Sequence, residues 1–258
     1  MKRGILVISH GSREQEWVQL VDAAVAAAAA SPRLNGTPVV SSFLEIVEGR
    51  LIQDGIDALE QQGVTDMLVV PLFLSSGSTH VDEIGQAFGL PWVSDLAGDL
   101  GTFRVAARVK YGLPIDDDPE IAELLIHNIA ELTVEPATEA LLLIGHGSKE
   151  NVFHERWQHG LTLLGERLRK LGGYARAEYA MLLPDQAAKK LAAMHAEHPE
   201  EAVIVVPLFL SQGYFTNHVI PSRLEGLNYR YNGQAMLPHS AIERWLERQM
   251  TEWLENSH

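Results

Sequence analysis

The sequence contains no cysteine among its 258 residues. A disulfide framework, a thiolate nucleophile and a zinc site with cysteine ligands are therefore excluded. Any transition metal would have to be held by histidine and carboxylate side chains. The lack of disulfides also fits a cytoplasmic setting, which we expect for this chain.

Long hydrophobic runs are lacking too, although 46% of the residues are hydrophobic. No stretch approaches the ~20 apolar residues that a transmembrane helix needs. The alanine-rich stretch at 23–31 starts too late for a secretory signal, and we interpret it as the interior of a helix. We expect a water-soluble protein.

Basic residues are in the minority: 20 Lys and Arg stand against 34 Asp and Glu, a formal net charge of −14. Nucleic acids and anionic membranes require a clustered basic surface, and the sequence contains no basic run that would provide one. We therefore expect neither as a partner. An anionic small molecule would need only a few local Arg or Lys side chains.

Two sequence motifs each occur twice, and the two copies of each motif are separated by the same number of residues. His146 follows His10 by 136 positions, and Gly213 follows Gly77 by the same interval. The phrases are ISHGSRE at 8–14 with IGHGSKE at 144–150, and VVPLFLSSG at 69–77 with VVPLFLSQG at 205–213. One interval shared by two phrases indicates two copies of one domain, which we place at 1–134 and 135–258.

Within each copy, apolar runs alternate with segments of helical periodicity, which is typical of βαβ units with a parallel sheet flanked by helices. The fold class predicted is α/β with two homologous domains. The first copy is predicted to have strands at 4–9, 37–45, 66–74 and 103–114 and helices at 13–30 and 48–62. The second is predicted to have strands at 139–145, 174–182, 202–210 and 234–237 and helices at 152–171 and 185–197. A helix with Pro119 in its first turn occupies 116–132, before a linker at 133–139.

Ligands of open parallel sheets collect outside the carboxyl ends of the strands. His10 follows the first predicted strand, Glu45 ends the second and His80 lies just past the third, so we expect them at one edge of the sheet. Two imidazoles and a carboxylate suit Fe²⁺, Co²⁺ or Ni²⁺ in a site with open positions. Each residue alone has a simpler explanation: His10 as a solvated loop residue, Glu45 as a solvated strand end and His80 as an exposed residue near a helix start. Ser12 and Gln15, after His10, have the pattern of a helix capping box.

Through the motifs ILVISHGSRE, SFLE and VVPLFLSSGSTH and their counterparts in the second half, the sequence resembles the CbiX/SirB sirohydrochlorin chelatases in their long, two-domain form. These are class II chelatases, related to ferrochelatase. The resemblance implies a lyase of cobalamin or siroheme biosynthesis that inserts Co²⁺ or Fe²⁺ into sirohydrochlorin between two α/β domains, without ATP. The divalent metal is then a substrate, no organic cofactor is needed, and we expect a monomer with two fused halves.

Carried over to this sequence, the family's metal-handling histidines fall on His10 and His80 and its carboxylate on Glu45. We assign Glu45 to proton acceptance. In the family the second histidine usually stands two residues after the glycine and before an Asp-Ile-Pro segment, whereas His80 stands three residues after Gly77 and no such segment follows.

Sirohydrochlorin carries many carboxylates, which basic and hydroxyl side chains near the edge of the sheet could bind. Our candidates for substrate binding are Ser12, Arg13 and Arg50. Lys149 and Arg223 are further candidates in the second half.

The second half keeps fewer of these groups. At an interval of 136, His146 corresponds to His10, but Met181 corresponds to Glu45 and Thr216 to His80. We expect this half to be degenerate and to line the substrate site. A shifted pair of His146 and His218 is the alternative.

Other readings remain open at this stage. A metal or tetrapyrrole carrier would use the same histidines without turnover. A hydrolase that transfers phosphoryl groups would need a glycine-rich phosphate loop, which this sequence lacks.

Asp116 to Asp118 are expected to start a helix, with a Mg²⁺ site as the alternative. The remaining histidines, His258 included, receive no role. Four tryptophans are expected in the core: Trp17, Trp157, Trp245 and Trp253.

Overall fold

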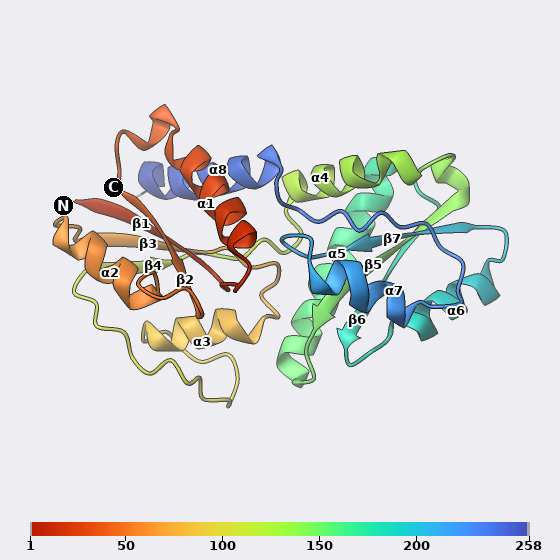
Figure 1. Ribbon diagram of the computed structural model, residues 1–258, viewed down its shortest axis with the longest axis horizontal. Coiled ribbons are helices and arrows are strands. Elements are labelled where there is room, and N and C mark those ends of the chain that lie inside the picture. The colour runs from red at the N-terminus through yellow and green to blue at the C-terminus, as the bar shows by residue number, and fades with distance from the viewer. Residues whose placement is uncertain (1, 257–258) are drawn as a thin grey trace. The chain divides into compact units, whose positions relative to one another are not determined.

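The computed structural model describes residues 2–256, so His258 lies outside the described residues (Figure 1). The chain forms two compact units. The first unit comprises Met1–Phe73, Thr79–Pro114 and Pro238–His258, and the second comprises Leu74–Ser78 and Ile115–Leu237. Among the described helices, none is long and apolar enough to cross a membrane.

The first unit is a parallel sheet with the strand order β2-β1-β3-β4. Its strands are β1 (Arg3–Ser9), β2 (Val39–Phe43), β3 (Asp66–Pro71) and β4 (Arg108–Tyr111). Its helices are α1 (Gln15–Ala29), α2 (Ile52–Gln61), α3 (Thr79–Ala87) and α8 (Ser240–Asn256). The predicted parallel α/β fold is confirmed here.

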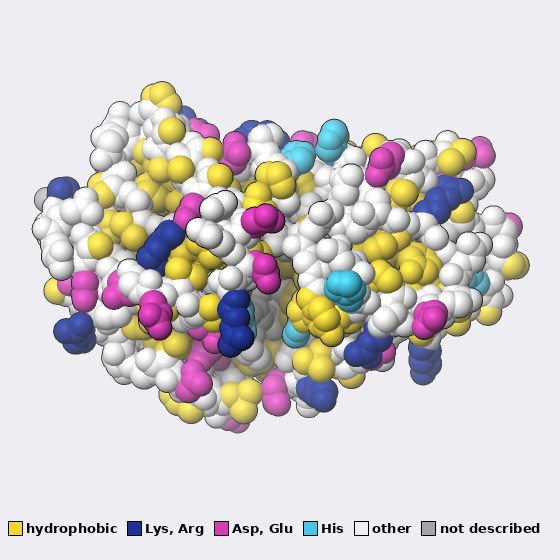
Figure 2. Space-filling view, viewed as in Figure 1, with side chains coloured by type: hydrophobic (Ala, Val, Ile, Leu, Met, Phe, Trp, Pro, Cys, Tyr) yellow, Lys and Arg dark blue, Asp and Glu magenta, His cyan; other side chains and the backbone are white. Residues whose placement is uncertain are grey.

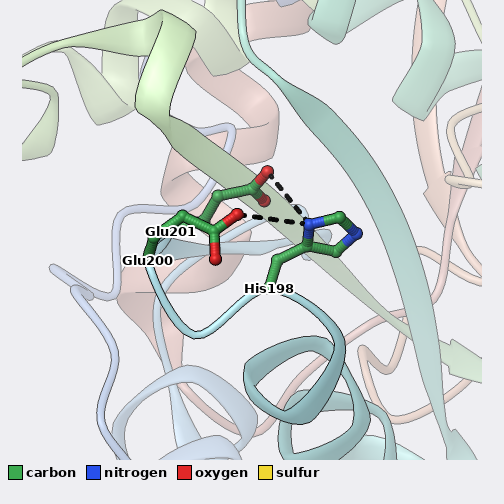
Figure 3. A group of neighbouring side chains, drawn as sticks. All are labelled: His198, Glu200 and Glu201. Atoms are coloured by element: carbon green, nitrogen blue, oxygen red, sulfur yellow. Dashed lines mark hydrogen bonds and ion pairs between the residues drawn. The ribbon is translucent and has the colours of Figure 1, made fainter.

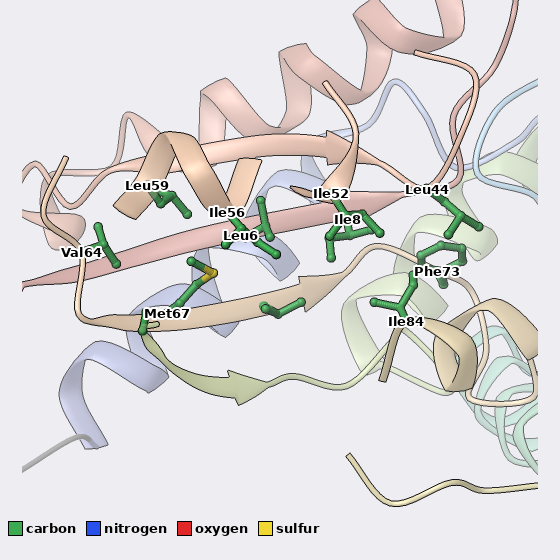
Figure 4. Packing of buried hydrophobic residues seen from close by; sticks show 12 residues of the cluster. Leu6, Ile8, Leu44, Ile52, Ile56, Leu59, Val64, Met67, Phe73 and Ile84 are labelled. Carbon is green, nitrogen blue, oxygen red and sulfur yellow. The ribbon is translucent and has the colours of Figure 1, made fainter. Parts of the chain in front are cut away.

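The continuous apolar character of β1 and β3 follows from burial on both faces, since Ile5 to Ile8 of β1 and Met67 to Val70 of β3 are buried. One face packs against α2 and α3, where Leu6, Met67, Ile56 and Ile84 belong to one core cluster (Figure 4). The cluster ends at Leu44 and Phe73, at the carboxyl ends of the strands, and so fixes the base of the loops that follow β2 and β3.

The second unit repeats the scheme with three parallel strands in the order β6-β5-β7. They are β5 (Glu139–Gly147), β6 (Arg176–Leu183) and β7 (Ala202–Pro207). Its helices are α4 (Pro119–Ile129), α5 (Asn151–Gly172), α6 (Ala187–Glu197) and α7 (Ile220–Arg223), with a π-helical turn at Phe215–Val219.

The strand predicted at 234–237 is wrong. Beyond β7 the described chain forms one isolated bridge, between Ile204 and Arg230. Residues Met236 and Leu237 donate backbone hydrogen bonds to Phe209 and Leu210, past the end of β7. The short apolar run is buried by covering a loop, which periodicity cannot distinguish from a strand.

The compact units do not coincide with the sequence halves. Helix α8 of the second half packs on α1 and β3 of the first unit. There Ser31 Oγ donates to Glu247 Oε1 at 2.6 Å, and Trp245 is buried. Helix α4 of the first half packs instead on α5 in the second unit. Each half therefore contributes its last helix to the other unit, and the division at 134 describes the repeat rather than the cores.

The start of α4 and the burial of the tryptophans agree in part with what the sequence predicts. Asp118 caps α4 by accepting from Glu120 N at 2.9 Å, with Pro119 in the first turn as predicted. Trp157 and Trp245 are buried, as expected, whereas Trp17 and Trp253 are only partly buried.

The repeated glycines Gly77 and Gly213 differ in their surroundings. A Cβ on Gly77 would lie 2.5 Å from Trp157 Cδ1 and 2.7 Å from Phe153 O and Trp157 N, so the segment 74–78 lies directly against α5. A Cβ on Gly213 would meet nothing within 4 Å. The first glycine is therefore required by packing and the second is not.

We predict that Gly77→Ala destabilises the protein by about 1–3 kcal/mol, because the methyl group must displace backbone atoms of α5. The matched variant Gly213→Ala should change stability by less than about 0.5 kcal/mol. Thermal unfolding of the two variants measures the difference, at roughly 2–4 °C per kcal/mol for a chain near this size. Equal midpoints would contradict the packing argument.

Candidate functional site

The three side chains predicted to share one edge lie together in the first unit. His10 follows β1, Glu45 follows β2 and His80 is in the first turn of α3. His10 Nε2 is 3.7 Å from Glu45 Oε1, and the His10 and His80 rings lie 4.8 Å apart at 76°. The sheet thus delivers two imidazoles and a carboxylate to one place.

Backbone contacts hold the loop after β2 against the loop after β1. Leu44 N donates to Ser9 O at 2.8 Å, and Glu45 N donates to His10 O at 3.2 Å. Gly11 has φ of +101°, and a Cβ on it would be 2.1 Å from Glu45 O. Glycine is required here because of both its φ and this close approach.

The hydrogen bonds of the two histidines determine which ring nitrogen is available. His10 Nδ1 is 3.2 Å from Gly11 O, and His80 Nδ1 is 3.3 Å from Glu83 Oε2. A carbonyl and a carboxylate accept hydrogen bonds, so Nδ1 carries the proton in each ring. The lone pair of a neutral imidazole is then on Nε2, as in histidines that bind metals.

His10 Nε2 therefore faces the carboxylate of Glu45 with a lone pair, and a cation between them would be favourable. Their separation of 3.7 Å puts the Glu45 carboxylate next to any ion that binds His10 Nε2. Glu45 is 55% exposed and both histidines are partly exposed, so water reaches the site. This is a site with open positions rather than an enclosed structural one.

Ser12 does not form the predicted capping box. Helix α1 begins at Gln15 with Glu14 as its N-cap and no side-chain cap. Ser12 Oγ accepts from Glu14 N at 3.0 Å, two residues on, so it stabilises the turn rather than the helix end. Next to it, Arg13 is exposed and makes no hydrogen bond or ion pair with any described residue, which leaves its charge available.

Arg50 and Arg223 already have partners within their own units. Arg50 donates two hydrogen bonds of 2.7 Å to the carboxylate of Asp22 and lies 4.8 Å over the ring of Phe43. Hydrogen bonding to Asp22 raises the pKa of the Arg50 guanidinium. Arg223 pairs with Asp185 at 2.5 Å. Both would have to share or exchange these partners to bind a substrate carboxylate.

Strand pairing changes the identity of the residue that corresponds to Glu45. Ser9 pairs with Phe43 in the first unit, and Gly145 pairs with Met181 in the second. Met181 thus corresponds to Phe43, and Leu183 takes the place of Glu45. The interval of 136 grows by two residues at the second strand, so the predicted equivalence of Met181 was wrong, but the carboxylate is still missing.

Phe215, rather than Thr216, occupies the place of His80. The ring of Phe215 lies 5.3 Å from that of His146 at 77°, as His80 lies beside His10. It is 5.2 Å from the ring of Phe209, the counterpart of Phe73, which lies 6.4 Å from His80. Thr216 is instead buried and accepts from Gly213 N at 2.9 Å.

The alternative pair of His146 and His218 finds no support in the geometry. Within the described chain, no hydrogen bond or ring contact joins these two histidines. The His218 ring lies 5.9 Å from that of Tyr214, which in turn contacts Phe215. With Leu183 and Phe215 in place of the other two groups, the second unit offers His146 a hydrocarbon and an aromatic neighbour rather than further ligands.

The run Asp116 to Asp118 does not gather its carboxylates around a common point. Asp118 caps α4, and Asp117 pairs with Arg167 at 2.8 Å. Asp116 Oδ1 accepts from Ser76 N at 2.8 Å and from Ser76 Oγ at 3.1 Å. The three carboxylates have separate partners, which leaves the Mg²⁺ alternative without support.

Asp116 holds the segment 74–78, which leads directly into α3 and His80. Besides the two bonds from Ser76, Asp116 N donates to Leu74 O at 3.0 Å. Its φ of +47° is uncommon for a residue other than glycine, which indicates that the surroundings impose it. Burial raises the pKa of Asp116, and the hydrogen bonds from Ser76 oppose that shift. No pattern in the sequence indicated this role of Asp116.

A second group of possible ligands lies at the end of α6, far along the chain from His10. His198 Nδ1 is 3.4 Å from Glu200 Oε1 and 3.8 Å from Glu201 Oε1 (Figure 3). Arg176 donates to Glu201 Oε2 at 2.9 and 3.0 Å. Since a guanidinium already compensates the partly buried carboxylate of Glu201, we interpret the group as an ion network at a helix carboxyl end.

We predict that Asp116→Gly lowers the Co²⁺ affinity of the His10 and His80 site by about tenfold, or ~1.4 kcal/mol. Glycine tolerates the positive φ but removes the acceptor for Ser76, so the loop before His80 loosens. Asp116→Asn keeps an acceptor oxygen and should stay within about twofold of the unchanged protein. The visible absorbance of Co²⁺ reports both affinity and ligand geometry.

Asp117→Ala is the control for this experiment, because it removes the pair with Arg167 without touching 74–78. It should leave the Co²⁺ spectrum unchanged. An equal loss of affinity in Asp117→Ala and Asp116→Gly, or no loss in either, would show that Asp116 does not position His80.

Comparison with known proteins gives matches over both halves. The CbiX family model matches residues 4–132 and 140–253. The sirohydrochlorin ferrochelatase of Bacillus subtilis (strain 168) is 29% identical over 155 residues, which cover 58% of this chain and 53% of that enzyme, about half its length. The sirohydrochlorin cobaltochelatase of Methanopyrus kandleri is 28% identical over 138 residues, covering 49% of this chain and 94% of that enzyme.

Solved structures share the fold over the full chain. SirB from Bacillus subtilis with Fe³⁺ has a TM-score of 0.76 at 23% identity and covers 100% of this chain and 97% of that one. CbiX, described as the terminal enzyme for siroheme biosynthesis in denitrifying bacteria, has a TM-score of 0.59 at 18% identity and covers 100% of both chains. With a family model that matches both halves, this chain belongs to the CbiX family.

Proposed function

We propose that this protein is a sirohydrochlorin chelatase, a lyase that inserts Co²⁺ or Fe²⁺ into sirohydrochlorin without ATP. The observation that carries the proposal is the meeting of His10, Glu45 and His80 at one open edge of the first sheet. The names of the curated relatives, sirohydrochlorin ferrochelatase and cobaltochelatase, support the choice of substrate. The divalent ion is a substrate in this reaction, and no organic cofactor takes part.

The two histidines would receive the ion. An aqueous divalent ion exchanges water for Nε2 of His10 and Nε2 of His80, while Nδ1 of each ring stays bonded to Gly11 O or Glu83. Imidazole nitrogens suit Fe²⁺, Co²⁺ and Ni²⁺ alike. A site with so few protein ligands holds the ion weakly enough to release it to the four nitrogens of the macrocycle.

Glu45 would take up protons. As the divalent ion enters, two pyrrole N–H protons must leave the macrocycle, so that the charge balances. The Glu45 carboxylate is adjacent to His10 and is 55% exposed, so it can accept a proton and pass it to water. Glu45 lies beside Nε2 of His10, the nitrogen that would bind the ion, and not beside Nδ1 on the far side of the ring. This position favours proton acceptance over a purely structural role.

Basic and hydroxyl groups next to the site would bind the substrate carboxylates. Arg13 is the strongest candidate, because it is exposed and has no partner among the described residues. Ser12 lies beside it, and Arg50 would act through a guanidinium shared with Asp22. We further propose a cytoplasmic monomer that serves cobalamin or siroheme biosynthesis.

A carrier of metal or tetrapyrrole is the alternative function. A carrier needs the histidines but has no use for a proton acceptor, so Glu45 beside His10 favours the enzyme. An enzyme and a carrier can be distinguished by mixing catalytic amounts of the protein with sirohydrochlorin and Co²⁺, Fe²⁺ or Ni²⁺ and following the absorbance of the tetrapyrrole. Many turnovers per chain are expected. Spectral change limited to one equivalent would favour the carrier.

His10→Ala and His80→Ala should each lower the metallation rate at least about a hundredfold, since a single imidazole competes poorly with water for the ion. His146→Ala is the matched control in the second unit. It should keep at least about a tenth of the rate, a barrier increase of no more than ~1.4 kcal/mol. A His146 variant as inactive as the His10 variant would overturn the assignment to the first unit.

Glu45→Gln keeps the size and polarity of the side chain but removes its basicity. It should lower turnover by about tenfold to a hundredfold, within the range attributed to general base catalysis. Co²⁺ affinity, measured by titration, should fall by less than about threefold. Equal losses in turnover and Co²⁺ affinity would instead make Glu45 a metal ligand.

A further inference from the structure

Glu83 in α3 contacts His80 on one side and the loop 93–99, which follows α3, on the other. Its Oε2 lies 3.3 Å from Nδ1 of His80, one helical turn away. Its Oε1 accepts a hydrogen bond of 3.2 Å from Asp99 N. The Glu83 side chain is only 18% exposed, and all of these residues belong to the first unit. Glu83 therefore joins a metal-handling histidine to a loop that lies outside the candidate site.

Two further side chains of α3 fix the loop to the helix. Asp82 is buried, and its Oδ1 accepts from Val93 N at 2.9 Å. Gln86 uses both ends of its amide: Oε1 accepts from Gly98 N at 2.9 Å, and Nε2 donates to Leu96 O at 2.9 Å. Because the loop backbone is bonded at several points, its place along the helix is set independently of Glu83.

The loop lies directly against the Glu83 side chain at Gly98. A Cβ on Gly98 would lie 2.6 Å from Cγ of Glu83 and 3.3 Å from its Cβ. The lack of a side chain at residue 98 lets the loop backbone approach this closely. The Glu83 carboxylate is thereby confined between the loop and the His80 ring.

A carboxylate is the side-chain group that suits both contacts. Nδ1–H of His80 and N–H of Asp99 are both donors, and an ionised carboxylate presents an acceptor oxygen to each. An amide has one oxygen and one NH₂ group, so one of the two donors would face another donor. A carboxylate that accepts from Nδ1–H also keeps the lone pair on Nε2 and increases the basicity of the ligand.

We infer that Glu83 is a positioning residue for metal handling: held by the loop 93–99, it fixes the His80 ring with Nδ1 protonated and Nε2 free for the ion. Glu83 does not touch the ion and acts through His80. The inference rests on the proposed function and deepens it, because it names the group that prepares one of the two ligands. Its loss should weaken ion binding without disrupting the fold.

Glu83→Gln keeps the size of the side chain but leaves one of the two donors without an acceptor. It should raise the dissociation constant for Co²⁺ of the full-length protein about ten- to a hundredfold, the range for loss of a hydrogen-bond partner behind a metal ligand. The fixed Asp99 N–H retains the amide oxygen, so NH₂ faces the His80 ring. The ¹⁵N shifts of His80 in the metal-free protein at alkaline pH should therefore change to those of the Nε2-protonated tautomer.

Gly98→Ala tests the contribution of the loop without removing a charge. Gly98 does not have a positive φ, so the backbone tolerates alanine, but the methyl group must displace Cγ of Glu83. Co²⁺ affinity should fall by roughly fivefold or more, with the same change of the His80 tautomer. Gly85→Ala is the matched control in α3, because a Cβ there would lie 3.7 Å from Leu90 Cδ1, an ordinary contact. It should change neither quantity.

A double change separates positioning from simple attraction by charge. Figure 2 shows acidic side chains over the part of the first unit that α3 and the loop form, and Asp95 and Asp99 are exposed. If Glu83 acts through His80, adding Glu83→Gln to His80→Ala should change the remaining Co²⁺ affinity by less than about twofold. If the charge of Glu83 attracts the ion directly, the loss persists without His80.

Three results would overturn the inference: a loss that persists in the His80→Ala background, unchanged Co²⁺ affinity in Glu83→Gln, or a loss of affinity with an unchanged His80 tautomer. An unchanged protein that binds Co²⁺ through His80 but never metallates sirohydrochlorin would refute the proposed function. The role of Glu83 in preparing the ion site would then still stand.

Discussion

Strand β1 hydrogen-bonds to β2 on one side and to β3 on the other, all three parallel, and the position of each proposed metal-handling group depends on that pairing. The pairing brings the ends of β1 and β2 level, since Ser9 pairs with Phe43. His10 and Glu45 then face each other one and two residues beyond. Because β3 and nearly all of β1 are buried, a slip in register would move apolar side chains out of the core as well as separate the site.

The sequence was enough to predict the parallel α/β fold, the repeat and the meeting of His10, Glu45 and His80, because continuous apolar strands and the carboxyl-end rule carry that information. The sequence did not reveal that the last helix of each half packs in the other unit. The apolar stripe of α8 shows that the helix is buried, through Trp245 for example, but not on which core it packs. Asp116 was also missed, because a hydrogen bond to Ser76 leaves no periodic pattern.

The equivalences predicted for the second half show the limit of a constant interval. Two additional residues before the second strand put Leu183 in the place of Glu45, and one residue fewer between Gly213 and Phe215, in the loop after the third strand, puts Phe215 in the place of His80. Both changes replace a polar group by an apolar one. This half therefore has no counterpart of Glu45 or His80 at the corresponding positions, although the residues found there differ from those predicted. What this half retains is an exposed aromatic surface on an intact scaffold.

Three residues with no place in the chemistry affect the site through the backbone and packing. Asp116 holds the segment before His80, Gly77 lets that segment lie on α5, and Gly11 lets the loops after β1 and β2 touch. Glu83 adds the hydrogen bond that leaves Nε2 of His80 free. The ion site is thus small, but its geometry is fixed by several elements.

Locating the bound ion tests most directly whether the first unit handles the metal. Crystals grown with Co²⁺ and measured at the cobalt absorption edge should show one cobalt per chain, bonded to Nε2 of His10 and Nε2 of His80 at ~2.1 Å, with Glu45 beside it. Cobalt bound instead by His146 and His218, by the His198 group, or at two equivalent sites would contradict the assignment of metal handling to the first unit.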